Sequence, residues 1–223
     1  MSSAYAENSS NPYPPSIRVN GTGKISTKPD KADLALSVEV HARTADAARN
    51  QAAAAMDTLI RSLINSHVAE KDIQTRSISL YPNYSPDAGN KIIGYQLTNQ
   101  VAVCVRDVEK AGDIIDSAVK ASGNTTRIEG ITYGIENPEN ALTEARKKAY
   151  ANAKSKAEQY AKLANLTLGA PLYISEGSDI PSTPLPYTEM RTLKAEMVDS
   201  SSTPLQAGEQ EVTVSVDVMF SIQ

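Results

Sequence analysis

Residues 211–222 read EVTVSVDVMFSI, and this stretch decides the fold class. Apolar side chains at every second position alternate with mostly polar ones, which is the period of a strand with one buried and one wet face. Residues 34–41, LALSVEVH, show the same alternation. Strands of this kind are typical of antiparallel sheets whose other face is covered by helices. The sequence therefore predicts an α+β protein with largely antiparallel sheets, and not a doubly wound α/β fold.

Three helices are predicted between the strands. The first covers residues 45–65 and follows Thr44, a residue type that favours the helix N-cap. The second covers residues 108–121, and the third has Asn137 as its N-cap and Pro138 at its first position and ends near residue 166. Alanine recurs at every fourth position of the third helix, so one of its faces is narrow enough to lie close to a sheet. These positions are Ala141, Ala145, Ala149, Ala153, Ala157 and Ala161.

The remaining strands are short segments bounded by turn residues. They are expected at residues 17–27, 77–81, 92–106, 126–135 and 172–175. The strand at 17–27 and the one at 34–41 are close enough along the chain to pair as a hairpin. Together these elements predict one or more sheets packed by three helices.

The chain is expected to form one folded domain behind a polar leader. Residues 1–15 are rich in Ser, Asn and Pro and are expected to be a flexible leader, and residues 16–223 form the α+β domain. A smaller second lobe, built from the second helix and its flanking strands, is the alternative layout. Within the domain, residues 176–209 form an extended Pro-rich excursion. Its apolar residues are expected to contact a neighbouring subunit: Leu185, Tyr187, Met190, Leu193 and Met197.

Composition excludes several classes of protein. The 223 residues carry 22 Lys and Arg against 26 Asp and Glu, so a surface dedicated to nucleic acid is not expected. The longest apolar runs fall far short of a transmembrane segment. One Cys and two His exclude a disulfide framework and an ordinary zinc site within one chain. We therefore expect no metal, no cofactor, no nucleic-acid partner and no transmembrane segment.

No catalytic motif stands out in the sequence. Gly21-Thr22-Gly23 lacks the third glycine of a dinucleotide-binding loop and predicts a strand bulge or a close backbone approach. Cys104 is either a nucleophile, with His41 or His67 as its partner, or an inert thiol, and its place in a long strand favours the inert thiol. We assign no catalytic residue and expect no enzyme.

Three tyrosines gather around one strand connection and form a tentative ligand surface. They are Tyr81, Tyr84 and Tyr95. Exposed tyrosine rings suit contacts with proteins or small molecules, because the ring is apolar and its hydroxyl is polar.

A series of short stretches resembles the SIMPL-domain family in the family's order. The opening one is Val19-x-Gly21-x-Gly23-x-Ile25, followed by Pro29-Asp30. The others are residues 70–75 (EKDIQT), 81–84 (YPNY), 94–103, 107, 145–158, 174–177 (ISEG) and 204–212. The resemblance covers about residues 17–222, and it rests on the ordered set because each stretch is short.

The resemblance implies a cellular location and a general type of function. Members are mostly exported and soluble, and they include bacterial periplasmic immunogenic proteins and periplasmic proteins linked to oxidative-stress tolerance. Some assemble into large homo-oligomeric rings with a central channel. The family has no established enzymatic activity or catalytic residues, so none are carried over. The implied location is periplasmic or extracellular, without a signal peptide in the chain.

The N-terminal residues do not decide whether the chain carries the remnant of an export signal. Ala4-Tyr5-Ala6 has the small-x-small form of a signal-peptidase site, but no basic and apolar segments precede it. The tripeptide is either the remnant of a signal-peptide end or a coincidence, and the family resemblance favours the remnant.

Two hypotheses of function follow. The first is a non-enzymatic, self-assembling, soluble protein of the cell envelope, with a link to oxidative-stress tolerance; deletion of residues 180–203 should then reduce the assembly. The second is a small-molecule or peptide-binding module that uses the tyrosine-lined surface. A pocket lined by these rings would support the second hypothesis.

Overall fold

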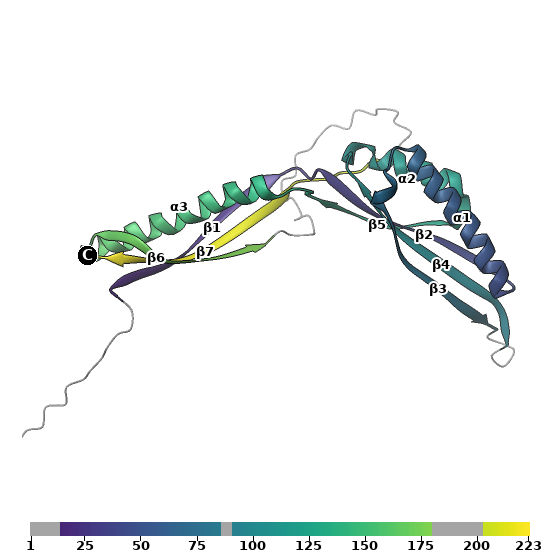
Figure 1. Ribbon diagram of the computed structural model, residues 1–223, viewed down its shortest axis with the longest axis horizontal. Coiled ribbons are helices and arrows are strands. Elements are labelled where there is room, and N and C mark those ends of the chain that lie inside the picture. Colours follow the sequence, from purple (N-terminus) through teal and green to yellow (C-terminus); the bar gives the residue numbers. More distant parts are fainter. Residues whose placement is uncertain (1–13, 86–90, 180–202) are drawn as a thin grey trace, which may run out of the picture. The chain divides into compact units, whose positions relative to one another are not determined.

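The computed structural model describes residues 14–85, 91–179 and 203–223. This part of the chain contains three α-helices and two antiparallel sheets, one of three and one of four strands (Figure 1). The predicted α+β class with three helices is confirmed. The chain divides into two compact units. Unit 1 is formed by Met1–Thr27, Asn137–Pro181 and Glu211–Gln223, and unit 2 by Lys28–Glu136 and Ser182–Gln210.

Unit 1 is a three-stranded sheet covered on one face by a single long helix. Its sheet order is β1-β7-β6, so the C-terminal strand is central (Figure 1). The elements are β1 (Ser16–Thr27), α3 (Glu139–Leu163), β6 (Leu168–Asp179) and β7 (Gln210–Ile222). The alternating apolar residues of β7 are buried, as their period predicts. They are Val212, Val214, Val216, Val218 and Phe220.

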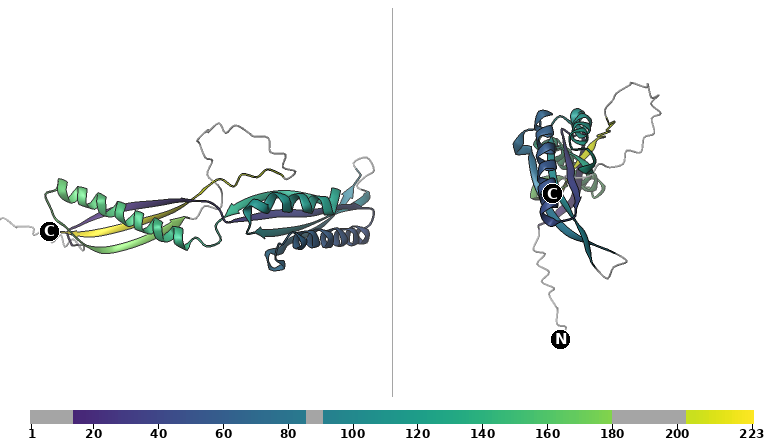
Figure 2. Two further views of the ribbon diagram at one scale, coloured as in Figure 1. Left: turned by 90° about the horizontal axis from the view of Figure 1, so that it is seen from above. Right: turned by 90° about the vertical axis from the view of Figure 1, so that its right-hand side faces the viewer.

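The helix α3 lies unusually close to β1, because both elements carry small residues where they meet (Figure 2). A Cβ atom added to Gly23 would overlap the carbonyl oxygen of Ala145 and lie 2.5 Å from the nitrogen of Ala149. A Cβ atom on Gly21 would overlap the carbonyl oxygen of Ala149 and lie 2.6 Å from the nitrogen of Ala153. The predicted close backbone approach at Gly21 and Gly23 is therefore confirmed.

The alanine repeat of α3 and the glycine repeat of β1 have nearly equal spacing along their axes. Four helix residues rise about 6 Å, and two strand residues rise about 6.6 Å. Alanine at every fourth position of α3 therefore meets glycine at every second position of β1 over two successive steps. The buried alanines of α3 are Ala145, Ala149, Ala153, Ala157 and Ala161.

Unit 2 is a four-stranded sheet with two helices on one face. Its sheet order is β3-β4-β2-β5. The elements are β2 (Lys31–Ala42), α1 (Ala45–Asn65), β3 (Ile73–Tyr84), β4 (Ile92–Val105), α2 (Ala111–Ser122) and β5 (Thr126–Gly134). The hydroxyl of Thr44 accepts a hydrogen bond from the Ala47 N–H at 3.2 Å, which confirms the predicted N-cap of α1. Apolar residues of β2, β4, α1 and α2 form one core.

The predicted hairpin between the first two strands is wrong. β1 pairs within the three-stranded sheet, and β2 pairs with β4 and β5. The connection at Pro29-Asp30 is held to the end of β5 instead of forming a turn back onto β1. The Asp30 N–H donates to the Gly134 carbonyl at 3.1 Å, and its carboxylate accepts from the Glu136 N–H at 2.6 Å. These bonds direct the chain into the second sheet.

The second helix does not form a separate lobe. α1 and α2 contact each other on the same sheet, and the Ser62 hydroxyl donates to the Ser117 carbonyl at 3.1 Å. The boundary between the two compact units lies elsewhere, because the third helix and the C-terminal strand form unit 1. Whether residues 16–223 act as a single domain stays a prediction.

Candidate interaction surface

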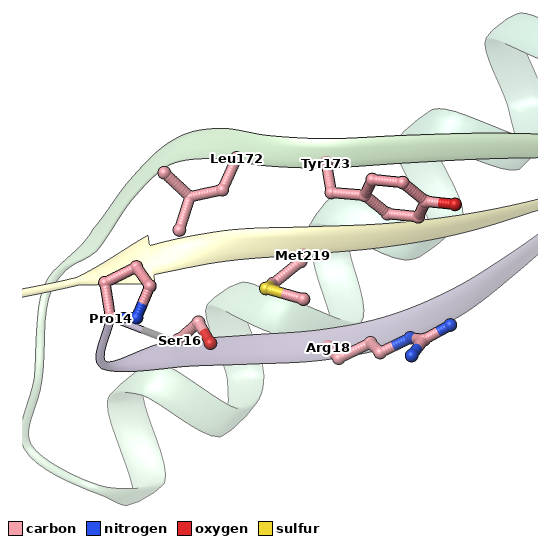
Figure 3. A pocket seen from close by; sticks show the side chains of 6 residues that line it. All are labelled: Pro14, Ser16, Arg18, Leu172, Tyr173 and Met219. Carbon is pink, nitrogen blue, oxygen red and sulfur yellow. The ribbon is translucent and has the colours of Figure 1, made fainter. Parts of the chain in front are cut away.

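The sheet of unit 1 has one face that α3 does not cover. Figure 3 shows side chains of all three strands on this face, pointing away from α3. They line a shallow cavity of about 740 Å³. Its lining is mainly apolar with one cation, and it consists of Pro14, Ser16, Arg18, Leu172, Tyr173 and Met219. A wide, shallow, largely apolar surface suits a macromolecular partner better than an enclosed small molecule.

The strand β6 is exposed on both of its faces. All residues from Pro171 to Gly177 are exposed, and they include three large apolar side chains in succession. Leu172, Tyr173 and Ile174 keep 48%, 50% and 53% of their surface accessible. Among the described strands, β6 pairs with β7 alone, so no described strand occupies the other edge of β6. Such an edge is a template for pairing with another strand.

The opposite edge, β1, is covered by polar side chains of α3. Lys148 donates through Nζ to the Lys24 carbonyl at 3.1 Å, and Lys156 donates to the Asn20 carbonyl at 2.8 Å. Between them, the Thr22 N–H donates to Asn152 Oδ1 at 3.2 Å. We call Lys148, Asn152 and Lys156 the polar ladder.

The polar ladder follows the same spacing as the alanine and glycine repeats. Its three residues are four apart on α3, and the backbone groups that they meet are two apart on β1. Residues two apart on a strand direct their backbone groups to the same side. The ladder therefore engages the groups of β1 that a further strand would need.

The three tyrosines of the tentative ligand surface do not share one face. In the register of β3 and β4, Tyr81 lies opposite Gln96, whereas Tyr95 lies opposite Pro82. Neighbouring positions on a strand point to opposite faces, so Tyr81 and Tyr95 are on opposite sides of the sheet. Tyr81 and Tyr84 are 66% and 53% exposed, and Tyr95 packs against the core.

A hydrogen-bonded network lies beside Tyr81, on the sheet face away from the helices. Asn83 Nδ2 lies 3.4 Å from His41 Nδ1, and His41 Nε2 lies 3.4 Å from Glu39 Oε1. Arg127 donates to the same Glu39 oxygen at 3.3 Å. Burial alone would raise the pKa of Glu39, but the hydrogen bond from His41 and the charge of Arg127 outweigh it and hold that pKa below its usual value. The carboxylate thus stays charged and bound.

The cysteine and a histidine line one small cavity of unit 2. The cavity has a volume of about 230 Å³, and its lining includes Cys104, His67 and Asp72. Asp72 is an ion-pair partner of Arg106, which also binds Glu136 at 2.7 Å. Burial, and then the negative charge of Asp33, raise the pKa of the Cys104 thiol. A raised pKa disfavours the thiolate, and this favours the inert thiol over the nucleophile.

Other expected site residues lie outside the described part of the chain. Leu185, Tyr187, Met190, Leu193 and Met197, predicted as oligomer contacts, all fall in 180–202. Within residues 14–85, 91–179 and 203–223, no helix has the length and hydropathy of a membrane span. The described side chains include no group of three His, Cys, Asp or Glu placed to hold a metal ion.

The comparison with known proteins places the chain in a family. Residues 17–220 match the SIMPL family, described as "Protein of unknown function (DUF541)", so the chain belongs to this family. The resemblance carried by the short sequence stretches is thereby confirmed. The match spans both compact units. No enzymatic activity is named for the family.

Named relatives cover almost the whole chain. The 26 kDa periplasmic immunogenic protein of Brucella melitensis biotype 1 is 35% identical over 225 residues, 97% of this chain and 88% of the relative. The protein of the same name in Brucella abortus (strain S19) gives the same values. The uncharacterized protein YggE of Escherichia coli (strain K12) is 31% identical over 213 residues, 95% of this chain and 85% of the relative.

Sequence reasoning missed the two features that define the interaction surface. It predicted β6 only as residues 172–175, whereas the strand is Leu168–Asp179 and lies at a sheet edge. It did not place Lys148 and Lys156 of α3 on β1, whose carbonyl groups they bind. The four-residue spacing of Lys148, Asn152 and Lys156 was visible in the sequence, but its target on β1 was not.

Proposed function

We propose that this protein is a non-enzymatic, self-assembling, soluble protein of the periplasm or cell exterior. The exposed strand β6 carries the proposal, because it presents three successive large apolar side chains, two of which line the shallow cavity. Contiguous exposed apolar surface of this kind marks interaction sites. The location is supported by the Brucella relatives, whose names contain the word periplasmic.

Charging this surface is expected to reduce the assembly. The variant Leu172→Lys/Tyr173→Lys places two cations on β6, where association would have to desolvate them. We expect light scattering on the full chain to give a mass well above 23.9 kDa for the wild type and a lower mass for the variant.

The matched control is Tyr160→Lys/Leu163→Lys on α3, where the side chains are 59% and 80% exposed. This control should keep the wild-type mass. A wild-type mass of 23.9 kDa at micromolar concentration would contradict the proposal.

The segment 180–203 is proposed as a second contact between subunits. Its five apolar residues named above motivate the proposal. Thr203, the last residue of the segment, is bound to α2. The Thr203 N–H and hydroxyl both donate to Asp116 of α2, at 2.8 and 2.6 Å. Deletion of residues 180–203 is expected to lower the mass of the assembly. An unchanged mass would remove this segment from the interface.

A link to oxidative-stress tolerance remains part of the proposal through the family resemblance. The raised pKa of Cys104 speaks against a direct reaction of this thiol with peroxide. We propose instead that a protective role depends on the assembly. Loss of peroxide tolerance in cells that express the Leu172→Lys/Tyr173→Lys variant would support that dependence.

The second candidate function is a small-molecule or peptide-binding module. The network of Asn83, His41, Glu39 and Arg127 beside Tyr81 favours it, because exposed polar groups and a ring lie on one sheet face. Titration of the chain with short polar peptides or oligosaccharides, followed by NMR, would test it. Shifts of the Tyr81 and His41 signals would support this function, and unshifted signals would count against it.

A further inference from the structure

The outer strands of the four-stranded sheet, β3 and β5, carry local irregularities that hinder pairing with a further strand. In β3, the register with β4 shifts between Thr75 and Ser77, which leaves Arg76 without a partner, and Pro82 lacks an N–H group. In β5, Ala35 pairs with Gly130 and Leu36 with Ile128, which leaves Glu129 without a partner. Bulges and prolines are common means of protecting sheet edges from further strands.

In unit 1, β6 has a regular edge beyond Pro171, over seven consecutive residues that pair with β7. Its register with β7 is irregular around Pro171 but regular from Tyr173 to Asp179. The exposed residues from Pro171 to Gly177 include no lysine, which is a frequent protecting residue at sheet edges. The polar ladder of α3 engages β1, the other edge of this sheet. Among the described strands, β6 is therefore the edge best suited to accept another strand.

We propose that β6 pairs with β6 of a second copy of this chain, in an antiparallel ladder with its two-fold axis at Ser175. This proposal rests on the proposed self-assembly and names the partner strand. Pairing would join two three-stranded sheets into one six-stranded sheet. A second copy is the natural partner, because the sequence of β6 is complementary to itself in this register.

The register follows from the charges and sizes of the side chains. Glu176 is bound by Arg146 of α3 at 3.0 Å, so a two-fold axis at Glu176 would place two identical ion pairs opposite each other, like charge against like charge, which is unfavourable. An axis at Ser175 places Glu176 opposite Ile174 and Tyr173 opposite Gly177. A Cβ added to Gly177 would meet no atom within 4 Å, so space exists beside Gly177 for the partner's ring. Tyr173, Ser175 and Gly177 lie on the same face as Met219, Asp217 and Ser215 of β7.

The polar ladder limits how far this pairing can extend. If both edges of the sheet were open, copies could pair β6 to β6 and β1 to β1 without end. Lys148, Asn152 and Lys156 already bind the outward groups of β1. Strand pairing in unit 1 therefore stops after two copies.

A single-cysteine experiment tests the proposed pairing. In a full chain with Cys104→Ser, the variant Ser175→Cys places two thiols across the two-fold axis, where strand partners lie about 4.5–5.5 Å apart. This distance suits a disulfide. We expect mild oxidation to convert most of the protein to a covalent dimer. The control Ser26→Cys, on the closed β1 edge, should remain uncrosslinked.

The outcomes separate this inference from the proposed function. A high mass by light scattering without a Ser175→Cys dimer would overturn the β6 pairing and leave self-assembly standing. A monomeric mass without a dimer would overturn both. A high mass with a dimer at Ser175→Cys and none at Ser26→Cys supports both.

Removal of the polar ladder tests the closed edge. The variant Lys148→Ala/Asn152→Ala/Lys156→Ala exposes β1 and is expected to form much larger, open-ended assemblies. The control Lys147→Ala/Lys154→Ala also removes two positive charges from α3. These two lysines form ion pairs with Glu144 and Glu158 of α3 itself and are not part of the polar ladder. The control should keep the wild-type mass. A ladder variant with the wild-type mass would overturn the role of the ladder.

Discussion

The substitution Gly23→Ala is expected to destabilise unit 1 by about 3 kcal/mol, at the upper end of what overpacking costs. The added methyl group would overlap the Ala145 carbonyl oxygen and lie 2.5 Å from the Ala149 nitrogen and 2.9 Å from Lys148 Cβ. Two of these three atoms belong to the helix backbone, which cannot rotate out of the way as a side chain can. The whole of α3 would have to move away from the sheet.

Amide hydrogen exchange of β1 and β7 measures this effect within unit 1. Movement of α3 would also weaken the polar ladder, so the exchange of Thr22 should accelerate most. The matched control is Gly177→Ala in β6 of the same sheet, where the added methyl group meets open space within the chain. Because Gly177 lies in the proposed β6 contact between copies, both variants are compared in the Leu172→Lys/Tyr173→Lys background. The control should leave stability equal or slightly higher, since alanine loses less conformational entropy than glycine. Equal stability of Gly23→Ala and Gly177→Ala would contradict the close packing.

The substitution Gln210→Glu is expected to destabilise unit 2 by about 3 kcal/mol at neutral pH. Gln210 is 3% exposed, and its side-chain amide donates a hydrogen bond to the Tyr133 carbonyl. An ionised carboxylate cannot donate, so the variant would bury a negative charge against an acceptor. Gln210 and Tyr133 both belong to unit 2, so this hydrogen bond lies within that unit.

The loss at Gln210→Glu should depend on pH in a definite direction. Burial raises the pKa of the new carboxyl in the folded state above its value in the unfolded chain. Below the unfolded pKa, the carboxyl is protonated in both states and can donate to Tyr133, so the loss is small. As the pH rises above that value, folding must hold a proton that the unfolded chain releases, and the loss grows.

Hydrogen exchange of β2 and β5 at pH 4.5 and pH 7.5, each compared with the wild type, would measure this difference. The control Gln74→Glu makes the same substitution at an exposed position of β3 and should show little effect at either pH. A loss at Gln210→Glu that is equal at both values of pH would contradict the donor role of Gln210.

Much of the fold could be predicted because local patterns report burial. The alternation in Val212–Phe220 and in Leu34–Val40 reports a strand with one buried face, wherever that strand pairs. Thr44 predicted the start of α1 for a similarly local reason, since an N-cap bonds only to its own helix. The lack of recognisable catalytic motifs and the ordered stretches of the SIMPL family could also be recognised from the sequence alone.

The pairing of strands was harder to predict from the sequence. β1 and β2 follow each other in sequence, yet they belong to different sheets because bonds from Asp30 to Gly134 and Glu136 turn the chain. Tyr81 and Tyr95 are close in sequence, but the register of β3 and β4 sends them to opposite faces. A shift of one residue would reverse this outcome, and periodicity alone does not set the register between strands.

The sequence by itself determined the α+β class, three helices and membership of the SIMPL family, and it left a bulge or a close approach as the alternatives at Gly21 and Gly23. These depend on side-chain size and spacing along one segment. The tertiary structure decided what lies beside each outer strand of unit 1. α3 lies along β1, so Lys148, Asn152 and Lys156 engage its backbone, whereas no described strand pairs with the outer edge of β6. Whether an outer strand can pair further depends on what packs beside it. That neighbour is set by long-range packing, which no local sequence pattern encodes.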